Sequence, residues 1–191
     1  IGLNGFGILI HLDDKTKLRY FNAHLNWRPY GPKLINTTSP DECVKRTYNA
    51  MGKDMIDILH NLVNHKNNDI DSITLLGGDF NIPSHLDWTE ETKHLHFDSV
   101  VKWPVSELLE KEDFIDIYRH INVSSLKYPG NTWPCKSKDE MGFEPISDRI
   151  DFIYCKNNLN IDFLSSQEFI YNNDKWISDH KGVEAIINIS N

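Results

Sequence analysis

Four short polar motifs follow or interrupt apolar runs of the sequence, and their side chains are of the kinds that bind cations and transfer protons. The motifs are Phe21-Asn22-Ala23-His24-Leu25, Gly78-Asp79-Phe80-Asn81, Arg149-Ile150-Asp151 and Ser178-Asp179-His180. Carboxylate and amide oxygens are ligands that a hard divalent cation prefers, and imidazole transfers protons near neutral pH. Taken alone, each motif also has an ordinary structural interpretation, as a turn or a buried hydrogen bond. Only their combination and order carry a specific prediction.

The elements that must position these motifs alternate between strands and helices. Apolar runs over residues 6–12 and 18–25 flank a polar cluster and predict a β-hairpin with His24 at the end of its second strand. Ser39-Pro40-Asp41-Glu42 is typical of a helix N-terminus, and apolar residues spaced by three and four predict a helix to about residue 65. The run 72–76 predicts a buried strand, with Asp79 at its carboxyl end after two glycines. Further strands are expected over 150–155, 161–170 and 183–189, a short helix over 105–112, and irregular segments over 26–38, 82–104 and 126–148. This order predicts a layered α/β domain.

The composition predicts one folded domain and excludes several classes of protein. The chain has 191 residues, 39% of them hydrophobic, and its 28 acidic and 20 basic side chains give a net charge of −8. We expect neither a membrane span nor a leader peptide. An acidic chain is poorly suited to following a nucleic-acid backbone, because such binding draws its affinity from many lysine and arginine contacts. The three cysteines show no Cys-x-x-Cys spacing, which favours a reducing compartment such as the cytoplasm.

In their joint order and separation, the four motifs resemble those of the endonuclease/exonuclease/phosphatase superfamily. This superfamily includes pancreatic-type deoxyribonucleases, abasic-site endonucleases, sphingomyelinases and inositol polyphosphate phosphatases. The resemblance runs from about Gly7 to Ile189, which is nearly the whole chain. It implies a four-layer α/β sandwich, in which two mixed β-sheets pack face to face and helices flank them. It also implies Mg²⁺-dependent hydrolysis of phosphoric esters, with Mn²⁺ as the alternative cation.

The resemblance implies a role for each matching residue. Asp79 would hold or deprotonate the attacking water, and Asn81 would position this water and the phosphate. His180 would contact the phosphoryl oxygens or act as general base, while His24 would bind the phosphate from the other side or protonate the leaving oxygen. Asp179, Asp79 and Asn81 are the expected metal ligands. Substrate contacts are expected from Asn22, Arg28, Tyr30, Asn131 and Trp133, of which Arg28 and Tyr30 lie in a Pro-containing loop that follows His24.

Two acidic residues flank Arg149, and either of them could orient His180. Some branches of the superfamily place this acid just before the arginine, as Asp148 is placed here, and others place it two residues after, as Asp151 is placed. Alternation along a strand puts Asp148 and Asp151 on opposite faces, so only one can reach His180. The sequence favours Asp151, because Ile-Asp-Phe-Ile-Tyr resembles the sphingomyelinase and deadenylase branches.

The chain departs from the superfamily pattern at its amino end. Members begin with one strand ending in Asn and a second ending in a Gln-Glu pair, whose glutamate is the main metal ligand. The only Gln-Glu pair here is Gln167-Glu168, which lies between Asp151 and Asp179 and so in the wrong order. We therefore expect that residues 1–191 form a single domain truncated at its amino end, without the first strands and helices, and that the metal site is incomplete.

The acidic charge favours a small phosphodiester or phosphomonoester over duplex DNA, for example a lipid head group, an inositol phosphate or a nucleotide. A nucleic-acid substrate is the alternative, since acidic nucleases occur in this superfamily. A different class of function is also open: the incomplete metal set could belong to an inactive scaffold or interaction domain of the same fold. A monomer is expected in either case.

Overall fold

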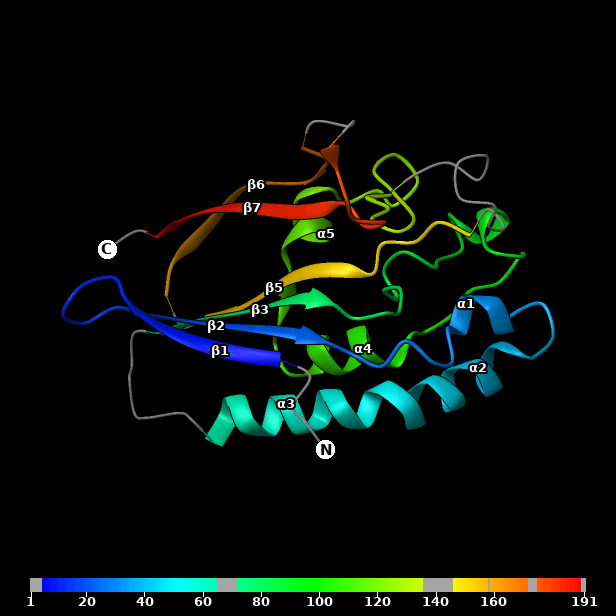
Figure 1. The fold of residues 1–191 in the computed structure, drawn as a ribbon, viewed down its shortest axis with the longest axis horizontal. Helices are drawn as coiled ribbons and strands as arrows, with labels where there is room; N and C mark the ends of the chain where they lie inside the picture. Colours follow the sequence, from blue (N-terminus) through cyan, green and yellow to red (C-terminus); the bar gives the residue numbers. More distant parts are fainter. Residues whose placement is uncertain (1–4, 65–71, 136–145, 158, 172–174, 190–191) are drawn as a thin grey trace.

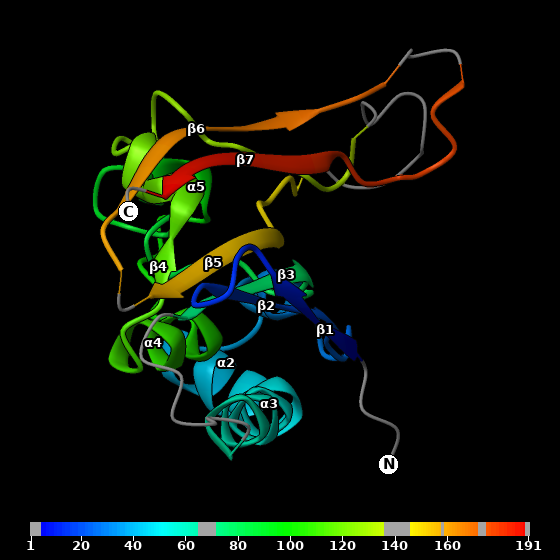
Figure 2. The same cartoon turned by 90° about the vertical axis from the view of Figure 1, so that its left-hand side faces the viewer.

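The computed structural model describes residues 5–64, 72–135, 146–157, 159–171 and 175–189, and it contains two β-sheets. The larger sheet has the strand order β1-β2-β3-β5-β4, and the smaller one pairs β6 with β7. Figures 1 and 2 show α2, α3 and α4 on the face of the larger sheet that points away from β6 and β7. The predicted mixed α/β sandwich is therefore confirmed.

The predicted strands and the predicted helix over 105–112 agree with the observed elements to within a few residues. The strands are β1 (Gly5–His11), β2 (Lys17–His24), β3 (Ser72–Asp79), β4 (Ile115–Asp116), β5 (Asp151–Asn157), β6 (Ile161–Phe169) and β7 (Gly182–Ile189). The helices are α1 (Gly31–Leu34), α2 (Pro40–Thr47), α3 (Lys53–Asn64), α4 (Pro104–Lys111) and α5 (Ile117–Ile121). Residues 136–145 of the predicted loop 126–148 lie outside the described residues, as does the predicted helix end at residue 65.

The order of pairing in the larger sheet creates the edge at which the candidate site lies. Asp13 closes the predicted β1–β2 hairpin, since its Oδ1 accepts hydrogen bonds from the backbone N–H groups of Lys15 and Thr16 at 2.8 and 2.7 Å. β2 pairs in parallel with β3, and β3 pairs antiparallel with β5. The carboxyl ends of β2 and β3 therefore meet the amino end of β5 at one edge of the sheet.

The helical segment that follows the first hairpin starts as predicted but is not one regular helix. The Ser39 hydroxyl oxygen accepts a hydrogen bond from the backbone N–H of Glu42 at 3.3 Å, which caps α2. A π-helical turn at Tyr48–Gly52 then separates α2 from α3. Apolar side chains of this segment fill the core between the helices and the sheet, among them Cys43, Met51, Met55, Ile58 and Leu59. None of the helices in the described residues has the length and apolar character needed to cross a membrane.

Three short elements have no counterpart in the sequence predictions. α1 lies within the segment predicted to be irregular, and β4 and α5 follow α4 without a periodic pattern long enough to predict them. Asp116 connects the last two, because its Oδ1 accepts the backbone N–H of Arg119 at 3.1 Å and so caps α5. α5 contributes Ile117 to a second core, which lies between the two sheets.

Four buried charged side chains fix the irregular segment 82–104 to the rest of the domain. Arg149, just before β5, donates hydrogen bonds to Asp87 at 3.0 Å and to Asp116 at 2.7 Å. Arg119 of α5 donates to the same Asp87 carboxylate at 2.6 Å. Two arginines and two aspartates therefore compensate one another where water does not reach them.

Candidate active site

Three neighbouring strands bring three of the predicted catalytic side chains into one row. The register pairs His24 at the end of β2 with Asp79 at the end of β3, and Asp79 with Asp151 at the start of β5. His180, in the segment before β7, lies against this row. Its Nε2 is 3.9 Å from Asp79 Oδ2, and His24 Nε2 is 3.5 Å from the same oxygen. The cluster is thus built from four segments that are far apart in the sequence.

Backbone geometry around Asp79 explains why glycine precedes this residue and why asparagine follows two positions later. Gly78 has φ +130°, and a Cβ at this position would lie 1.9 Å from the carbonyl oxygen of Ala23, so only glycine lets β3 approach β2 here. Asn81 adopts a left-handed conformation with φ 54°. Its backbone N–H donates to Asp79 Oδ1 at 2.8 Å, and its side-chain Nδ2 donates to the carbonyl oxygen of Leu25 at 3.0 Å. Asn81 therefore holds the Asp79 carboxylate in place and ties it to the end of β2.

Asp151 is the acid that reaches His180, which is the choice favoured by the resemblance of Ile-Asp-Phe-Ile-Tyr to the sphingomyelinase and deadenylase branches. His180 Nδ1 lies 2.8 Å from Asp151 Oδ2, which leaves Nε2 facing Asp79. The Asp151 backbone is fixed in turn, because Thr132 Oγ1 accepts the N–H groups of Ile150 and Asp151 at 3.1 and 3.2 Å. Sequence reasoning does not assign this role to Thr132, whose only signal is its place between Asn131 and Trp133.

The charges around the row shift the pKa values of two of its members upward. Burial raises the pKa of Asp79 to about 6, and the nearby Asp151 carboxylate adds to the rise. Burial alone would lower the pKa of His180, but the hydrogen bond to Asp151 and the charges of Asp151 and Asp79 outweigh it, so this pKa is raised. A carboxyl group and an imidazole, both with raised pKa values, therefore face each other across a short gap.

A cavity of about 570 Å³ opens in front of this cluster. Most of the predicted site residues line it, together with Trp27, Lys33, Leu34 and Ile150, which were not among the predicted substrate contacts. The predicted residues in its wall are His24, Arg28, Tyr30, Asp79, Asn81, Trp133, Asp179 and His180. Trp27 is 55% exposed, and the guanidinium of Arg28 stacks 3.9 Å from the centre of its ring. Trp27 and Arg28 thus form a stacked pair in the cavity wall, here called the Trp27–Arg28 platform.

Two predicted substrate contacts lie elsewhere, and a third is only partly available. Asn22 lines a neighbouring depression that it shares with His24. Asn131 lines a different and larger cavity. The hydroxyl of Tyr30 donates to Asp148 Oδ2 at 2.5 Å, so Tyr30 presents its ring rather than its hydroxyl to the active-site cavity.

Asp148, the alternative partner of His180, lies on the other side of the wall. Its Oδ1 accepts the indole N–H of Trp88 at 3.0 Å, and its Oδ2 accepts the Tyr30 hydroxyl. Its backbone oxygen also accepts the N–H of Trp133 at 3.1 Å. Asp148 therefore positions two aromatic residues of the active-site wall without reaching His180.

The expected metal set is brought together only in part. Asp79, Asp151 and His180 each offer a ligand atom, and these atoms lie within 4.8 Å of one another. Asp179 stands outside this group, and its Oδ2 accepts the indole N–H of Trp133 at 3.0 Å. Of the two predicted carboxylate ligands, only Asp79 belongs to the observed group.

Comparisons with known proteins identify the fold. No family model matches the chain. An uncharacterized Caenorhabditis elegans protein is 34% identical over 161 residues, which cover 78% of this chain and 51% of that protein, so the chain spans about half the length of this relative.

Three solved structures are similar over most of the chain. A conserved Enterococcus faecalis protein of unknown function has a TM-score of 0.58 at 20% identity, with 97% of this chain and 56% of that one covered. An AP endonuclease from Archaeoglobus fulgidus has a TM-score of 0.52 at 17% identity, with coverages of 90% and 62%. D. rerio TDP2, solved with a single-strand DNA product, has a TM-score of 0.51 at 12% identity, with coverages of 96% and 61%. The chain therefore has the fold of the endonuclease/exonuclease/phosphatase superfamily, as its four motifs predict.

Proposed function

We propose that this protein hydrolyses phosphoric esters at the cluster of His24, Asp79, Asp151 and His180. The observation that carries the proposal is the strand register, which aligns His24, Asp79 and Asp151 on neighbouring strands while Asp151 orients His180. The fold supports it, because structures of this fold include an AP endonuclease and a DNA-bound TDP2. Both of those proteins act on or bind nucleic acid according to their descriptions, and neither fixes the substrate of this chain.

The geometry suggests a separate role in hydrolysis for each of Asp79, His180 and His24. Asp79, whose pKa is raised to about 6 mainly by burial, is ionised at neutral pH yet basic enough to accept a proton from an attacking water. His180 donates its Nδ1 proton to Asp151, so its Nε2 can contact a phosphoryl oxygen or exchange a proton beside Asp79. His24, on the opposite side of Asp79, is placed to bind the phosphate or protonate the leaving oxygen.

The donor set fits a divalent cation that keeps most of its water. Asp79 and Asp151 supply carboxylate oxygens within the 4.8 Å group, and Asp179 lines the same cavity. A bound Mg²⁺ or Mn²⁺ would neutralise charge that develops on the phosphoryl oxygens. Since one Asp79 oxygen accepts the Asn81 N–H and one Asp151 oxygen is engaged by His180, few protein ligands remain, and we expect weak binding of Mg²⁺.

The net charge of the chain and the Trp27–Arg28 platform favour a small ester over duplex DNA. The chain carries a net charge of −8, and such a surface disfavours tracking a long phosphate backbone. The Trp27–Arg28 platform suits a single flat or charged group next to the phosphate. A small phosphodiester or phosphomonoester is therefore the proposed substrate class.

The test is a hydrolysis panel with Mg²⁺ or Mn²⁺, using bis-nitrophenyl phosphate, nucleotides, phosphoinositides, sphingomyelin and plasmid DNA. Asp79→Asn and His180→Ala should each lower kcat by about 10²–10⁴, because each removes a group that acts in the transition state. His60→Ala, on the exposed side of α3, is the matched control and should keep full activity. Activity that survives either site variant, or a wild-type protein inactive on the whole panel with both cations, would contradict the proposal.

A further inference from the structure

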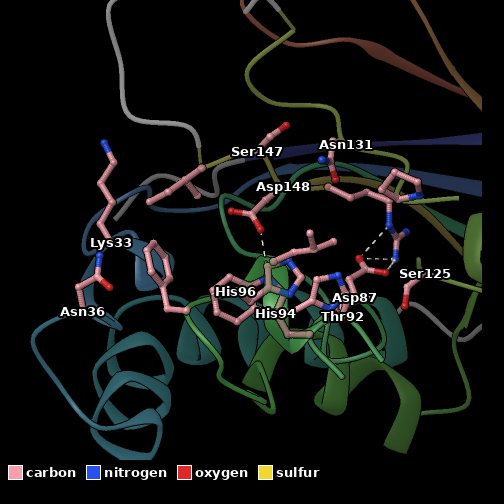
Figure 3. Close-up of a pocket in the computed structure, with 16 residues that line it drawn as sticks. Lys33, Asn36, Asp87, Thr92, His94, His96, Ser125, Asn131, Ser147 and Asp148 are labelled. Atoms are coloured by element: carbon pink, nitrogen blue, oxygen red, sulfur yellow. Dashed lines mark hydrogen bonds and ion pairs between the residues drawn. The ribbon is translucent and has the colours of Figure 1, made fainter. Parts of the chain in front are cut away.

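A short stretch of chain between α5 and β5 lies between the active-site cavity and a second, larger cavity of about 970 Å³. Figure 3 shows Asn131 and Asp148 in the wall of the larger cavity, which Phe97 also lines. Trp133, two positions after Asn131, lines the active-site cavity instead. The hydrogen bond from the Tyr30 hydroxyl to Asp148 belongs to the same partition. The two cavities therefore adjoin, and the stretch around Thr132 forms part of the wall between them.

This stretch is hydrogen-bonded to the chain that leads into β5. The backbone N–H groups of Thr132 and Trp133 both donate to the carbonyl oxygen of Asp148, at 3.0 and 3.1 Å, and the Asp148 N–H donates to the carbonyl oxygen of Trp133 at 2.9 Å. The Thr132 side chain extends this pairing, since its Oγ1 accepts the N–H groups of Ile150 and Asp151 at 3.1 and 3.2 Å. The Thr132 hydroxyl thus holds the backbone of Asp151 at the start of β5.

The same stretch is hydrogen-bonded to the chain that carries His180. The Lys181 N–H donates to the carbonyl oxygen of Thr132 at 2.8 Å, and the Cys135 N–H donates to the carbonyl oxygen of Asp179 at 2.8 Å. Because Asp179 and Lys181 flank His180 in the sequence, the backbone is held on both sides of this histidine. Thr132 therefore bonds both to Asp151 and to the residue next to its partner His180.

Thr132 itself does not face the active-site cavity. Its side chain is 0% exposed, and it belongs to the wall of neither cavity. Any effect of Thr132 on hydrolysis must therefore act through the residues that it holds. The geometry of those residues is demanding, because His180 Nδ1 lies 2.8 Å from Asp151 Oδ2 while Nε2 lies 3.9 Å from Asp79 Oδ2. A displacement of either backbone segment would disturb one of these two distances.

We propose that Thr132 is a positioning residue for the hydrolysis. Its carbonyl oxygen holds the chain beside His180, its hydroxyl holds the start of β5, and together they fix the distance between His180 and Asp151. The inference rests on the proposed function for its effect on catalysis, but the contact between His180 and Asp151 is observable without turnover. The backbone hydrogen bonds survive a change of side chain, so the hydroxyl is the part that a substitution tests.

The experiment compares Thr132→Val, which keeps the branched shape without the hydroxyl, with Thr132→Ser, which keeps the hydroxyl. Thr132→Val should lower kcat about 10- to 100-fold with KM unchanged, since a catalytic group displaced by up to about 1 Å loses activity on this scale. Thr132→Ser should keep most of kcat. Thr92→Val is the matched control, because Thr92 is also buried and its Oγ1 accepts the Thr89 N–H at 3.0 Å. This control should lose stability in urea but keep kcat.

The second measurement is the ¹⁵N NMR signal of the His180 ring, assigned by its absence in His180→Ala. It is recorded in buffer alkaline enough to keep the imidazole neutral. The wild type and Thr132→Ser should carry the ring proton on Nδ1, which faces Asp151, whereas Thr132→Val should show both tautomers. Circular dichroism checks the folding of each variant. If Thr132→Val does not fold, Thr132→Ala makes the same test, since its smaller side chain leaves room for a water to bond the two freed N–H groups.

Three results would overturn the inference. They are wild-type kcat and an unchanged His180 signal in a folded variant without the hydroxyl, an equal loss of kcat in Thr132→Ser, and an equal loss of kcat in Thr92→Val. If the wild type hydrolyses no ester, the proposed function fails, and the NMR comparison alone decides whether Thr132 positions the pair. If the wild type is active and removal of the hydroxyl changes neither readout, the positioning role fails and the proposed function stands.

Discussion

Asp148 provides a test of the partition between the two cavities. Its carboxyl group is buried, and burial raises its pKa to about 6 from an ordinary value of 3.8, although the hydrogen bonds from Tyr30 and Trp88 oppose the rise. At about 1.4 kcal/mol for each pKa unit, the ionised form costs the folded protein up to about 3 kcal/mol. This upper value for the ionisation cost is large compared with the contribution of an exposed carboxylate to the unfolding free energy.

The sign of the pH dependence follows from the direction of the shift. Between about pH 4 and pH 6 the folded protein holds a proton on Asp148 that the unfolded chain has released, so this group stabilises the fold at low pH. The stabilisation is lost as the pH rises through the folded pKa, and above about pH 6 the cost of ionisation is fully present. Asp148→Asn removes the titrating group, although the amide can accept only one of the two hydrogen bonds through its oxygen.

The assay is urea unfolding of the wild type and of Asp148→Asn at about pH 4.5 and pH 7.5. Relative to the variant, the wild type should lose about 2 kcal/mol of unfolding free energy between the two pH values, because about a third of the full cost is already present at pH 4.5. Comparing the two proteins at each pH cancels the contributions of all other carboxylates. Asp14→Asn, in the exposed hairpin turn, is the control and should show no such change. If the difference between wild type and Asp148→Asn is the same at both pH values, the description of Asp148 as a desolvated acid is wrong.

Two further predictions concern the stability and the surface of the domain. Asp87→Ala should reduce the unfolding free energy measured in urea by about 3–5 kcal/mol, because it leaves two buried arginines without a shared partner. Glu90→Ala, which removes an exposed ion pair with Lys93, is the control and should cost less than about 1 kcal/mol. Comparable losses in both variants would contradict the role of the ion network. Lysines at Ile8 and Ile10 should reduce aggregation measured by light scattering, since these exposed side chains lie on the edge strand β1, and unchanged scattering would contradict this explanation.

Local signals in the sequence predict the elements that carry the site. The Ser39 cap and the Asp13 turn each act within a few residues, and the structure contains the corresponding hydrogen bonds. These features could be predicted because their physical causes lie within a single segment of the chain.

The features that escape prediction depend on residues far apart in the sequence. Tyr30 and Asp148 are separated by 118 positions, and their hydrogen bond converts an expected substrate contact into a part of the wall. The cavity lined by Phe97 depends in the same way on packing among several loops, which have no periodic pattern. β4 and α5 are too short for any pattern to emerge, and the ion pairs of Asp116 hold them in place instead.

Three residues at and just before the start of β5 contact different parts of the domain. Asp148 contacts the aromatic wall, Arg149 enters the ion network beneath it, and Asp151 meets His180. Because side chains alternate between the faces of an extended chain, a shift of one residue would exchange these environments. It would place Ile150 or Phe152 where Asp151 now meets His180, and it would move Arg149 out of the buried ion network. Thr132 Oγ1 accepts hydrogen bonds from the backbone N–H groups of Ile150 and Asp151, and these two bonds oppose such a shift at the start of β5.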